Sequence, residues 1–483
     1  MAKRSRSPVE RAVRTSSRIA LYVSLAVTAL AGLALARFAR PPHDAVEAAR
    51  LSQLQSWTEK DYTQFEDVRL LAEYVRINTS YPDPDEVAGA RFLAARLEAA
   101  GIPATIEVLG ERDANLWAFV EGRDPRAIVL HGHLDVEEAL GQEGWRFPPY
   151  AAHIEGPWMF GRGIYDMKSL TIAQLLALVE LKKSGRPLAR SVLFLATSGE
   201  EKGSDLGTRW ILARHPELVA RMGLVLTEGG VVEATSPQDV KYWGIEFGQK
   251  TFADVEFCSA SRENLVELRR VLADRIAERP PDPPLSRPVE IFLDQYGPSR
   301  EFRPFQRLLA DPQRVFASYA DFMTLSPFLR SLFRSEIVPF AVEADPTGGF
   351  RLPAKLHLLP GADAETTVAD LLPAWLRHGV TVRLGELEGS RGFTPVDTPD
   401  FRTIAAVVAE AHPGIPVGPY FGQWAGSDAR FFRAAGIATY GFSPFLISVT
   451  DTMQIALPNE RMPLPGFRSG VELYRTVLAR LAE

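Results

Sequence analysis

The sequence predicts an α/β fold in which helices cover a mainly parallel sheet. Two observations indicate this fold class. Several short runs are continuously apolar, such as SVLFLAT at Ser191–Thr197, as expected for strands that are buried on both faces. These runs alternate with helical segments such as Met167–Lys183, whose leucines lie mostly on one side. The pattern is interrupted after about residue 248 and returns from Pro399, which predicts an inserted α+β domain.

The N-terminal region has the features of a transmembrane anchor. Residues 19–36 carry no charge, and a helix of this length spans roughly 27 Å, about the thickness of a bilayer core. Residues 1–18 form a basic segment with six Lys or Arg residues and one acid, which predicts a cytoplasmic N-terminus. We therefore expect a single-pass membrane protein whose remaining chain lies outside the cytoplasm, on the periplasmic, lumenal or extracellular side. A cleavable signal peptide is the alternative, because Ala34-Leu35-Ala36 resembles a cleavage site.

After a polar tether at residues 37–61, the main domain is expected at 62–247 and 389–483, with the inserted domain at 248–388. In the first part we expect helices at Asp85–Ala100, Met167–Lys183 and Leu206–Ala213, and strands at Ala104–Leu109, Ala127–Leu130, Ser191–Thr197 and Leu224–Thr227. In the inserted domain we expect strands at Phe252–Phe257, Lys355–Leu359 and Val380–Leu387, and helices at Glu263–Glu278 and Thr366–Arg377. Three further helices are expected at Phe401–Ala411, Asp428–Ala435 and Gly466–Ala482.

The composition excludes some classes of function. Hydrophobic residues make up 46% of the chain and charged residues 24%, as in ordinary globular proteins. The formal net charge of −6 gives no reason to expect a nucleic-acid partner. Cys258 is the single cysteine, so the chain has no intrachain disulfide framework, and this alone does not fix the compartment.

Acidic or imidazole groups follow three of the predicted strands. The strands run into His131-Gly-His133-Leu-Asp135, Ser198-Gly-Glu200-Glu201 and Glu228-Gly-Gly230, in that order. A fourth group, Asp166, lies in the glycine-containing turn GRGIYDMK at the start of a helix. Because ligands of parallel α/β sheets gather at the carboxyl ends of the strands, we expect these groups to meet.

One histidine and several carboxylates suit Zn²⁺ or a similar ion. Of the neighbouring carboxylates Glu200 and Glu201, one can bind the metal while the other transfers protons. Asp135, two residues after His133, can hold the imidazole in the tautomer that ligates a metal. Each motif alone is common by chance, and a Glu-Glu pair is usually solvated surface. Their shared position at strand ends is what predicts a metal site.

The motifs HGHLD, GRGIYDMKS, ATSGEEKGS and TEGG, in this order, resemble a family of zinc metallopeptidases and amidohydrolases. The family includes carboxypeptidase S, aminoacylase, acetylornithine deacetylase and succinyl-diaminopimelate desuccinylase. The resemblance runs from about residue 62 to the C-terminus and includes GSDARFF at 426–432 and PNER at 458–461. The N-terminal anchor is similar to the carboxypeptidase S branch. The resemblance implies a catalytic domain with two zinc ions and an inserted lid or dimerisation domain, and hence a homodimer.

The resemblance also implies a role for each candidate residue: metal ligation for His133, Asp166, Glu201 and Glu228, and catalysis for Asp135 and Glu200. Asp166 would bridge both ions, and Asp135 would orient the imidazole of His133. Glu200 would be the general base that activates a metal-bound water.

The sequence departs from the family at three places. The last metal ligand of the family, a His just before Asn-Glu-Arg, is replaced by Ala456, and no His follows His412. The second ion would therefore keep only two protein ligands, whereas the first would keep three. The turn Phe257-Cys258-Ser-Ala-Ser261 lacks the His that stabilises the oxyanion in the family, and loss of one such donor typically costs about 10²–10³ in kcat. His357 stands where a substrate-binding Arg is expected, and it is a candidate substrate contact or a plain surface histidine.

Two functions follow. The first is a hydrolase that cleaves amide bonds of short peptides or N-acyl amino acids through a metal-activated water, with one or two zinc ions or with Mn²⁺ or Co²⁺ instead. The second is a catalytically weak or inactive relative that acts as a membrane-tethered binding protein. Ala456 and the missing lid His favour the second function. The presence of Glu200 and of the ligands of the first ion favours the hydrolase.

Overall fold

The computed structural model describes residues 57–139, 141–237, 239–276, 278, 285–299, 311–389, 392–424 and 426–483. Ser56–Glu483 form one compact unit. The predicted transmembrane helix at 19–36, the basic segment before it and most of the tether lie outside the described residues. Within the described part of the chain, no helix is long and apolar enough to cross a membrane.

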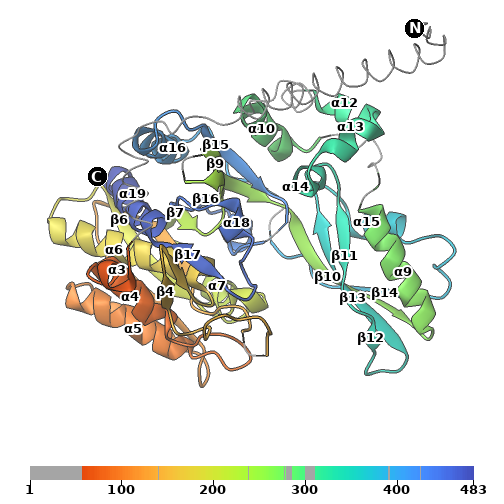
Figure 1. The fold of residues 1–483 in the computed structure, drawn as a ribbon, viewed down its shortest axis with the longest axis horizontal. Helices are drawn as coiled ribbons and strands as arrows, with labels where there is room; N and C mark the ends of the chain where they lie inside the picture. Colours follow the sequence, from red (N-terminus) through yellow and green to blue (C-terminus); the bar gives the residue numbers. More distant parts are fainter. Residues whose placement is uncertain are drawn as a thin grey trace, which may run out of the picture. The chain divides into compact units, whose positions relative to one another are not determined.

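The larger sheet has nine strands in the order β1-β2-β6-β3-β7-β16-β9-β15, with β8 paired to β9 (Figure 1). The strands are β1 (Ala104–Val108), β2 (Ala114–Val120), β3 (Asp124–His133), β6 (Arg190–Thr197), β7 (Met222–Thr227), β8 (Val231–Ser236), β9 (Asp239–Gln249), β15 (Val417–Gly422) and β16 (Thr439–Gly441). The central strands β6, β3, β7 and β16 are parallel, which confirms the predicted mainly parallel centre. The pairs β1–β2, β2–β6, β8–β9 and β9–β16 are antiparallel, so the sheet is mixed, which the sequence did not predict.

The central strands are continuously apolar because both of their faces are buried. In β3, Ile128 and Leu130 pack into one hydrophobic cluster, whereas Ala127 and Val129 pack into another. Side chains alternate between the two faces of a strand, so the two clusters lie on opposite faces of the sheet. The same alternation in β6 places Val192 in the first cluster with Ile128. This two-sided burial is the physical reason that apolar runs predicted a sheet covered on both faces.

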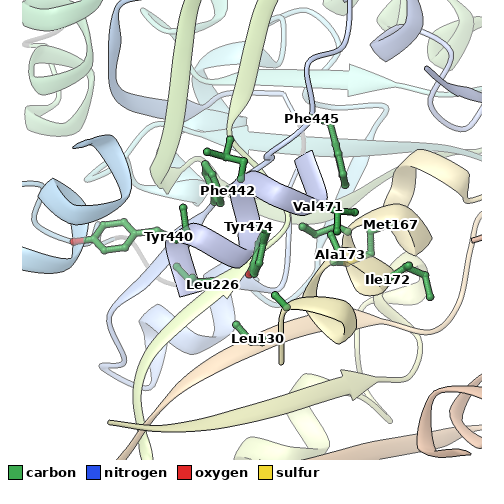
Figure 2. Close-up of a cluster of buried hydrophobic side chains, with 14 of the residues drawn as sticks. Leu130, Met167, Ile172, Ala173, Leu226, Tyr440, Phe442, Phe445, Val471 and Tyr474 are labelled. Atoms are coloured by element: carbon green, nitrogen blue, oxygen red, sulfur yellow. The ribbon is translucent and has the colours of Figure 1, made fainter. Parts of the chain in front are cut away.

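Helices cover both faces of this sheet. Those on the face of Leu130 are α4 (Glu66–Val75), α5 (Glu86–Ala99), α6 (Ser169–Ser184), α16 (Pro399–Ala411) and α19 (Leu464–Ala482), while α7 (Thr208–Arg214), α8 (Pro216–Val219) and α17 (Ala429–Ala434) cover the other face. Figure 2 shows Leu130 and Leu226 below Tyr474 of α19 and Ile172 of α6 farther to the right, all in the same hydrophobic cluster. The short helix α3 (Glu59–Tyr62) precedes α4.

Local sequence signals set the ends of these helices. The carboxylate of Asp85 accepts a hydrogen bond from the backbone N–H of Ala88 at the start of α5, as an N-cap does. At the end of α6, Gly185 adopts a left-handed conformation with φ of 65°, which glycine tolerates best. Helix α5 begins and ends within one residue of its predicted boundaries, and α6 ends one residue after its predicted end. Both predicted helices are therefore confirmed.

A second, antiparallel sheet has the order β11-β13-β10-β14, with β12 paired to β13. Its strands are β10 (Thr251–Ser259), β11 (Glu336–Pro339), β12 (Glu343–Ala344), β13 (Phe350–Leu358) and β14 (Thr381–Leu384), and the helices α9 (Arg262–Arg275) and α15 (Ala364–Leu371) pack on it. We call this part the inserted domain; its strands all fall inside residues 248–388, whose boundaries stay a prediction. The helix expected at 366–377 ends earlier, at Leu371, because Pro373 disfavours helix at the residue before it.

Further elements outside these two sheets include a third sheet of three strands, in the order β17-β5-β4, and several short helices. They are the helices α10 (Arg287–Tyr296), η3 (Gly297–Ser299), α12 (Pro312–Ala317), α13 (Tyr319–Thr324), α14 (Pro327–Ser331) and α18 (Val449–Thr452), and the strands β4 (His153–Glu155), β5 (Trp158–Phe160) and β17 (Arg461–Pro463). The antiparallel pair β5–β17 brings the C-terminal segment beside the turn that follows β5. This pairing positions one part of the candidate site.

Candidate metal centre

The candidate site lies at the carboxyl ends of the parallel strands of the larger sheet. β3 ends at His133, and both of its neighbours, β6 and β7, run parallel to it, so their carboxyl ends lie beside His133. β6 leads into the short helix η2 (Glu200–Lys202), and β7 is followed by Glu228. The turn η1 (Ile164–Lys168) before α6 supplies Asp166. The fold therefore brings together residues far apart in the sequence, as the sequence predicted.

His133 is buried, with 1% of its surface exposed, and its two ring nitrogens have different partners. Nδ1 lies 2.8 Å from the carbonyl oxygen of Asp135, and a carbonyl only accepts, so Nδ1 carries a proton that it donates. Nε2 faces the centre, 3.2 Å from Oδ1 of Asp166 and 3.6 Å from Oε2 of Glu228. In the neutral ring, Nε2 therefore keeps a lone pair directed at the two carboxylates, as a metal ligand requires.

Two sets of three side chains could each hold an ion. His133, Asp166 and Glu201 form one set, and His133, Glu200 and Glu228 form the other; within each set, the ligand atoms lie within 4.8 Å of one another. Imidazole and carboxylate are donors that suit Zn²⁺, Mn²⁺ and Co²⁺. The residues present thus fit a divalent cation, and His133 is the one imidazole in either set.

Burial and mutual repulsion raise the pKa of three of these carboxylates, which favours protons on them when no cation is present. Burial, followed by the charge of Asp166, raises the pKa of Glu228 to about 8. Burial also raises the pKa of Glu200 and of Glu201 well above the usual range, with repulsion from Glu228 and from Asp166 respectively adding to it.

His133 and Asp166 behave as an ion pair. Burial alone would lower the pKa of His133, but its hydrogen bonds with Asp135, Asp166 and Glu228 raise it well above its usual value. Although burial opposes the shift, the hydrogen bond with His133 holds the pKa of Asp166 below its usual range. Without a cation, the protonated imidazole of His133 therefore supplies positive charge to the centre.

Asp135 is fully buried and holds the turn that carries the two glutamates. Its two carboxylate oxygens accept hydrogen bonds from the backbone N–H groups of Glu200, at 3.0 Å, and Glu201, at 2.9 Å. Its carboxylate is 3.4 Å from Nδ1 of His133, farther than its own carbonyl oxygen. Asp135 thus orients the imidazole mainly through its backbone, whereas the sequence suggested the side chain.

A buried ion pair that the sequence did not reveal positions Asp166. One oxygen of Glu460 accepts hydrogen bonds from Arg162 Nη1 at 2.9 Å and from the backbone N–H of Gly163 at 3.0 Å. The other oxygen accepts from the backbone N–H groups of Tyr165, at 3.0 Å, and Asp166, at 3.4 Å. Arg162 and Glu460 are both 1% exposed at their side chains, so this pair fixes the backbone of the turn from inside the protein.

Gly163 is required in that turn. Its φ is 70°, and a Cβ atom there would lie 2.0 Å from Cγ1 of Val136. The second glycine of the Gly-Arg-Gly sequence before Asp166 is thus required because a larger residue would collide with Val136.

Ala456 lies in a segment whose backbone accepts hydrogen bonds from Arg162. Its carbonyl oxygen accepts a hydrogen bond of 3.2 Å from Nη2 of Arg162. Its φ is 58°, in the left-handed region. The backbone at position 456 is therefore tied to Arg162 and Glu460, and through Glu460 to Asp166, although the side chain offers no ligand atom.

His131, the first histidine of HGHLD, belongs to a separate buried network. Its Nδ1 lies 2.8 Å from the hydroxyl of Thr227, and its Nε2 lies 3.1 Å from that of Thr208. Thr208 donates in turn to the buried carboxylate of Asp428 at 2.6 Å, which also accepts from Ser204. Burial lowers the pKa of His131 to about 4, so the ring is neutral and holds strand ends together without joining either ligand set.

A cavity of about 490 Å³ opens beside the centre, between the larger sheet and the inserted domain. Glu200 and Glu201 line one side, and Lys355 and His357 of β13 line the other. The structure therefore places His357 on the wall of this cavity, and its contact with a substrate stays a prediction. Burial lowers the pKa of His357 to about 4, so its ring is neutral. Arg430, which the sequence did not single out, lies 3.4 Å from Oε1 of Glu200.

Comparison with known proteins matches most of this chain to one family of peptidases. A family model described as "Peptidase family M20/M25/M40" matches residues 129–480. A probable succinyl-diaminopimelate desuccinylase of Staphylococcus aureus (strain MRSA252) is 31% identical over 144 residues, which are 30% of this chain and 35% of that protein. The chain thus matches about a third of the length of the desuccinylases.

Two further similarities extend over most of the chain. Aminoacylase-1A of Rattus norvegicus is 26% identical over 423 residues, which cover 86% of this chain and 95% of that protein. The crystal structure of the metallo-carboxypeptidase Sso-CP2 from Sulfolobus solfataricus superimposes with a TM-score of 0.61 at 16% identity, covering 86% of this chain and 98% of that chain. This last similarity concerns the fold.

The pKa shifts predict that cation binding releases protons. In the cation-free centre the pKa of Glu228, about 8, favours a proton on this side chain at pH 7, and the raised pKa of His133 favours its protonated form. A cation needs their lone pairs, so we expect at least one proton released per ion and an affinity that rises between pH 6 and pH 8. Titration calorimetry with Zn²⁺ or Mn²⁺ at pH 7, in buffers of low and high ionisation enthalpy, measures the number of protons.

Two variants sharpen this measurement. Glu228→Gln should release fewer protons than the unchanged protein. Glu86→Gln is the matched control, because burial also raises the pKa of Glu86 to about 8 but Glu86 belongs to neither ligand set. A binding enthalpy independent of the buffer would show that the centre is already deprotonated and would contradict the assigned shifts.

Proposed function

The chain belongs to the peptidase family M20/M25/M40, and from that membership we propose that it is a metal-dependent hydrolase of amide bonds. Its substrates would be short peptides or N-acyl amino acids. One observation supports this proposal above the others. The carboxylate of Glu200 lies in the same cluster of ligand atoms as His133 and Glu228, so a proton acceptor and a cation site coincide.

The two ligand sets place Glu201 with His133 and Asp166, and Glu200 with His133 and Glu228. The division of roles that we propose within these sets is the one that the family resemblance implies. His133, Asp166 and Glu228 would hold one ion, and Asp166 and Glu201 would contribute to a second. A bound ion of this kind polarises an amide carbonyl and acidifies a water molecule. Glu200 would accept the proton from that water and donate it to the departing amine. Arg430, 3.4 Å from Oε1 of Glu200, opposes the rise of the Glu200 pKa that burial causes, which favours a base that can accept a proton.

The names of the related proteins support this class of reaction. The relatives described above are named as an aminoacylase, a probable desuccinylase and a metallo-carboxypeptidase, all of which are hydrolases. They give no support to the alternative of a membrane-tethered binding protein without catalysis. Zinc is the proposed metal, with Mn²⁺ or Co²⁺ as substitutes, since carboxylate-rich sites discriminate weakly between these ions.

We also propose the arrangement that the sequence predicts. Residues 19–36 would anchor the protein in a membrane, with residues 1–18 in the cytoplasm and the catalytic part on the other side. The inserted domain would act as a lid and could join two copies into a homodimer, as the family resemblance implies.

Glu200→Gln tests the proposed base. The variant keeps the size of the side chain but cannot accept a proton, so we expect kcat for an N-acyl amino acid to fall by about 10²–10⁴ while the metal content stays unchanged. Glu138→Gln is the control, because Glu138 is exposed and belongs to neither ligand set. Equal turnover in Glu200→Gln and the unchanged protein would remove Glu200 from this role.

Ala456→His tests whether the absence of a histidine at position 456 leaves the site of the second ion incomplete. The left-handed backbone at position 456 is one that histidine adopts more readily than most residues. We expect the unchanged protein to bind one ion tightly and Ala456→His to bind two, because the second ion would gain a third protein ligand. Metal analysis of the purified variants measures this number, and Ala456→Asn, which lacks the imidazole, is the control. The same stoichiometry in Ala456→His and the unchanged protein would refute this explanation.

A further inference from the structure

Glu86, the first residue of α5, is a fully buried carboxylate without a basic partner. Its exposed fraction is 0%, and among the described residues no ion pair includes it. Oε2 lies 3.5 Å from the backbone N of Ala114, at the limit of a hydrogen bond, and Oε1 has no hydrogen-bond partner in the described part of the chain. Burial raises the pKa of Glu86 to about 8, and the charge of Asp135 adds to this rise. A buried carboxylate is costly unless it is paired, so this position requires positive charge.

Three hydroxyl groups lie around this carboxylate. The hydroxyl oxygens of Tyr74, Thr79 and Ser198 are buried and, within the described residues, make no hydrogen bond. Ser198 faces Glu86 closely enough to lower the pKa of its carboxyl, and the charge of Glu86 adds to the rise that burial causes in the pKa of Tyr74. Gly89 lies one turn after Glu86 on α5, and a Cβ atom there would lie 3.4 Å from Cγ2 of Thr79 and 3.7 Å from the ring of Tyr74. Four oxygens without partners therefore gather at one buried place.

A proton on Glu86 satisfies this place poorly. Oε2 faces the N–H of Ala114, which is a donor, so the proton would have to lie on Oε1. No acceptor in the described structure lies within hydrogen-bond distance of Oε1, so the proton would be a buried donor without a partner. A cation needs only oxygen lone pairs, and the carboxylate and the three hydroxyl groups all provide them.

The charged neighbours of this place have other partners. Nζ of Lys168 donates hydrogen bonds to the backbone carbonyl oxygens of Tyr74, at 3.3 Å, and Ile77, at 2.7 Å. Each oxygen of Asp135 accepts a backbone N–H group. Glu86 is thus the one carboxylate left to face a cation among these groups. A single carboxylate with hydroxyl oxygens suits a monovalent ion better than Ca²⁺, which takes several charged ligands.

We propose that Na⁺ or K⁺ binds between Glu86 and the hydroxyl groups of Tyr74, Thr79 and Ser198. None of these residues belongs to either ligand set of the metal centre, so this is a separate cation site. The ion would compensate the mutual repulsion of Glu86 and Asp135. Since Asp135 holds the turn that follows β6, the ion would stabilise the backbone of the metal centre without contacting a substrate.

The melting temperature of the purified chain tests this site. It is measured at equal ionic strength with Na⁺, K⁺ or N-methyl-D-glucamine as the monovalent cation, the last being too large for a buried site. An ion that binds only the folded protein raises the melting temperature. We expect Na⁺ or K⁺, at about tenfold above Kd, to raise it by about 2 °C relative to N-methyl-D-glucamine. The ion with the larger shift is the ion of the site.

Two variants remove ligand atoms. Glu86→Gln should abolish the shift, and in N-methyl-D-glucamine it should melt at or above the temperature of the unchanged protein, because no buried charge then needs compensation. Thr79→Val keeps the shape of the side chain, removes one oxygen and should at least halve the shift, so it decides the question even if Glu86→Gln does not fold. Glu138→Gln is the control, because Glu138 is exposed, and it should keep the full shift.

Two outcomes would overturn the proposal. An equal shift in Glu86→Gln, Thr79→Val and the unchanged protein would assign the effect of the ion to the protein surface. Equal melting temperatures of the unchanged protein in all three salts would mean that a proton or a water molecule satisfies Glu86 instead of a monovalent cation.

Discussion

The crowding of four half-buried carboxylates around a single buried imidazole is the constraint on which the rest of this structure depends. Asp166, Glu200, Glu201 and Glu228 cannot all be ionised at such short distances unless positive charge compensates them. Without a cation, the raised pKa values of the glutamates and of His133 favour protons in that role. A divalent cation would supply it in their place, and the same exchange would leave Glu200 able to act as a base.

Keeping like charges together requires a rigid backbone, and buried polar groups provide it. Asp135 accepts the N–H groups of the turn that carries Glu200, and Glu460 accepts those of the turn that carries Asp166. Arg162 joins Glu460 to the segment of Ala456. Each carboxylate that binds backbone in this way fixes another that faces the centre, so the site is positioned by charged groups outside both ligand sets.

Much of the site could be predicted because strand ends carry it. The apolar runs that end before His133, Glu200 and Glu228 identified the sheet edge, since parallel strands place their carboxyl ends together. The pairing of Arg162 with Glu460, and of Arg430 with Glu200, could not be predicted, because contacts between residues so far apart depend on tertiary packing that local pattern does not record. The antiparallel edges of the larger sheet were missed for a related reason: strands such as β8 are short and half-exposed and lack a continuous apolar run.

The number of metal ions in the purified protein tests this account most directly. We would purify the chain without chelator, equilibrate it in turn with zinc, manganese and cobalt, remove free ions and measure metal by inductively coupled plasma mass spectrometry. At least one ion per chain is expected, because His133 and the carboxylates offer three ligand atoms within 4.8 Å of one another in each ligand set. No bound ion of any of the three metals would contradict the account, since the carboxylates would then have to be accommodated by protons alone.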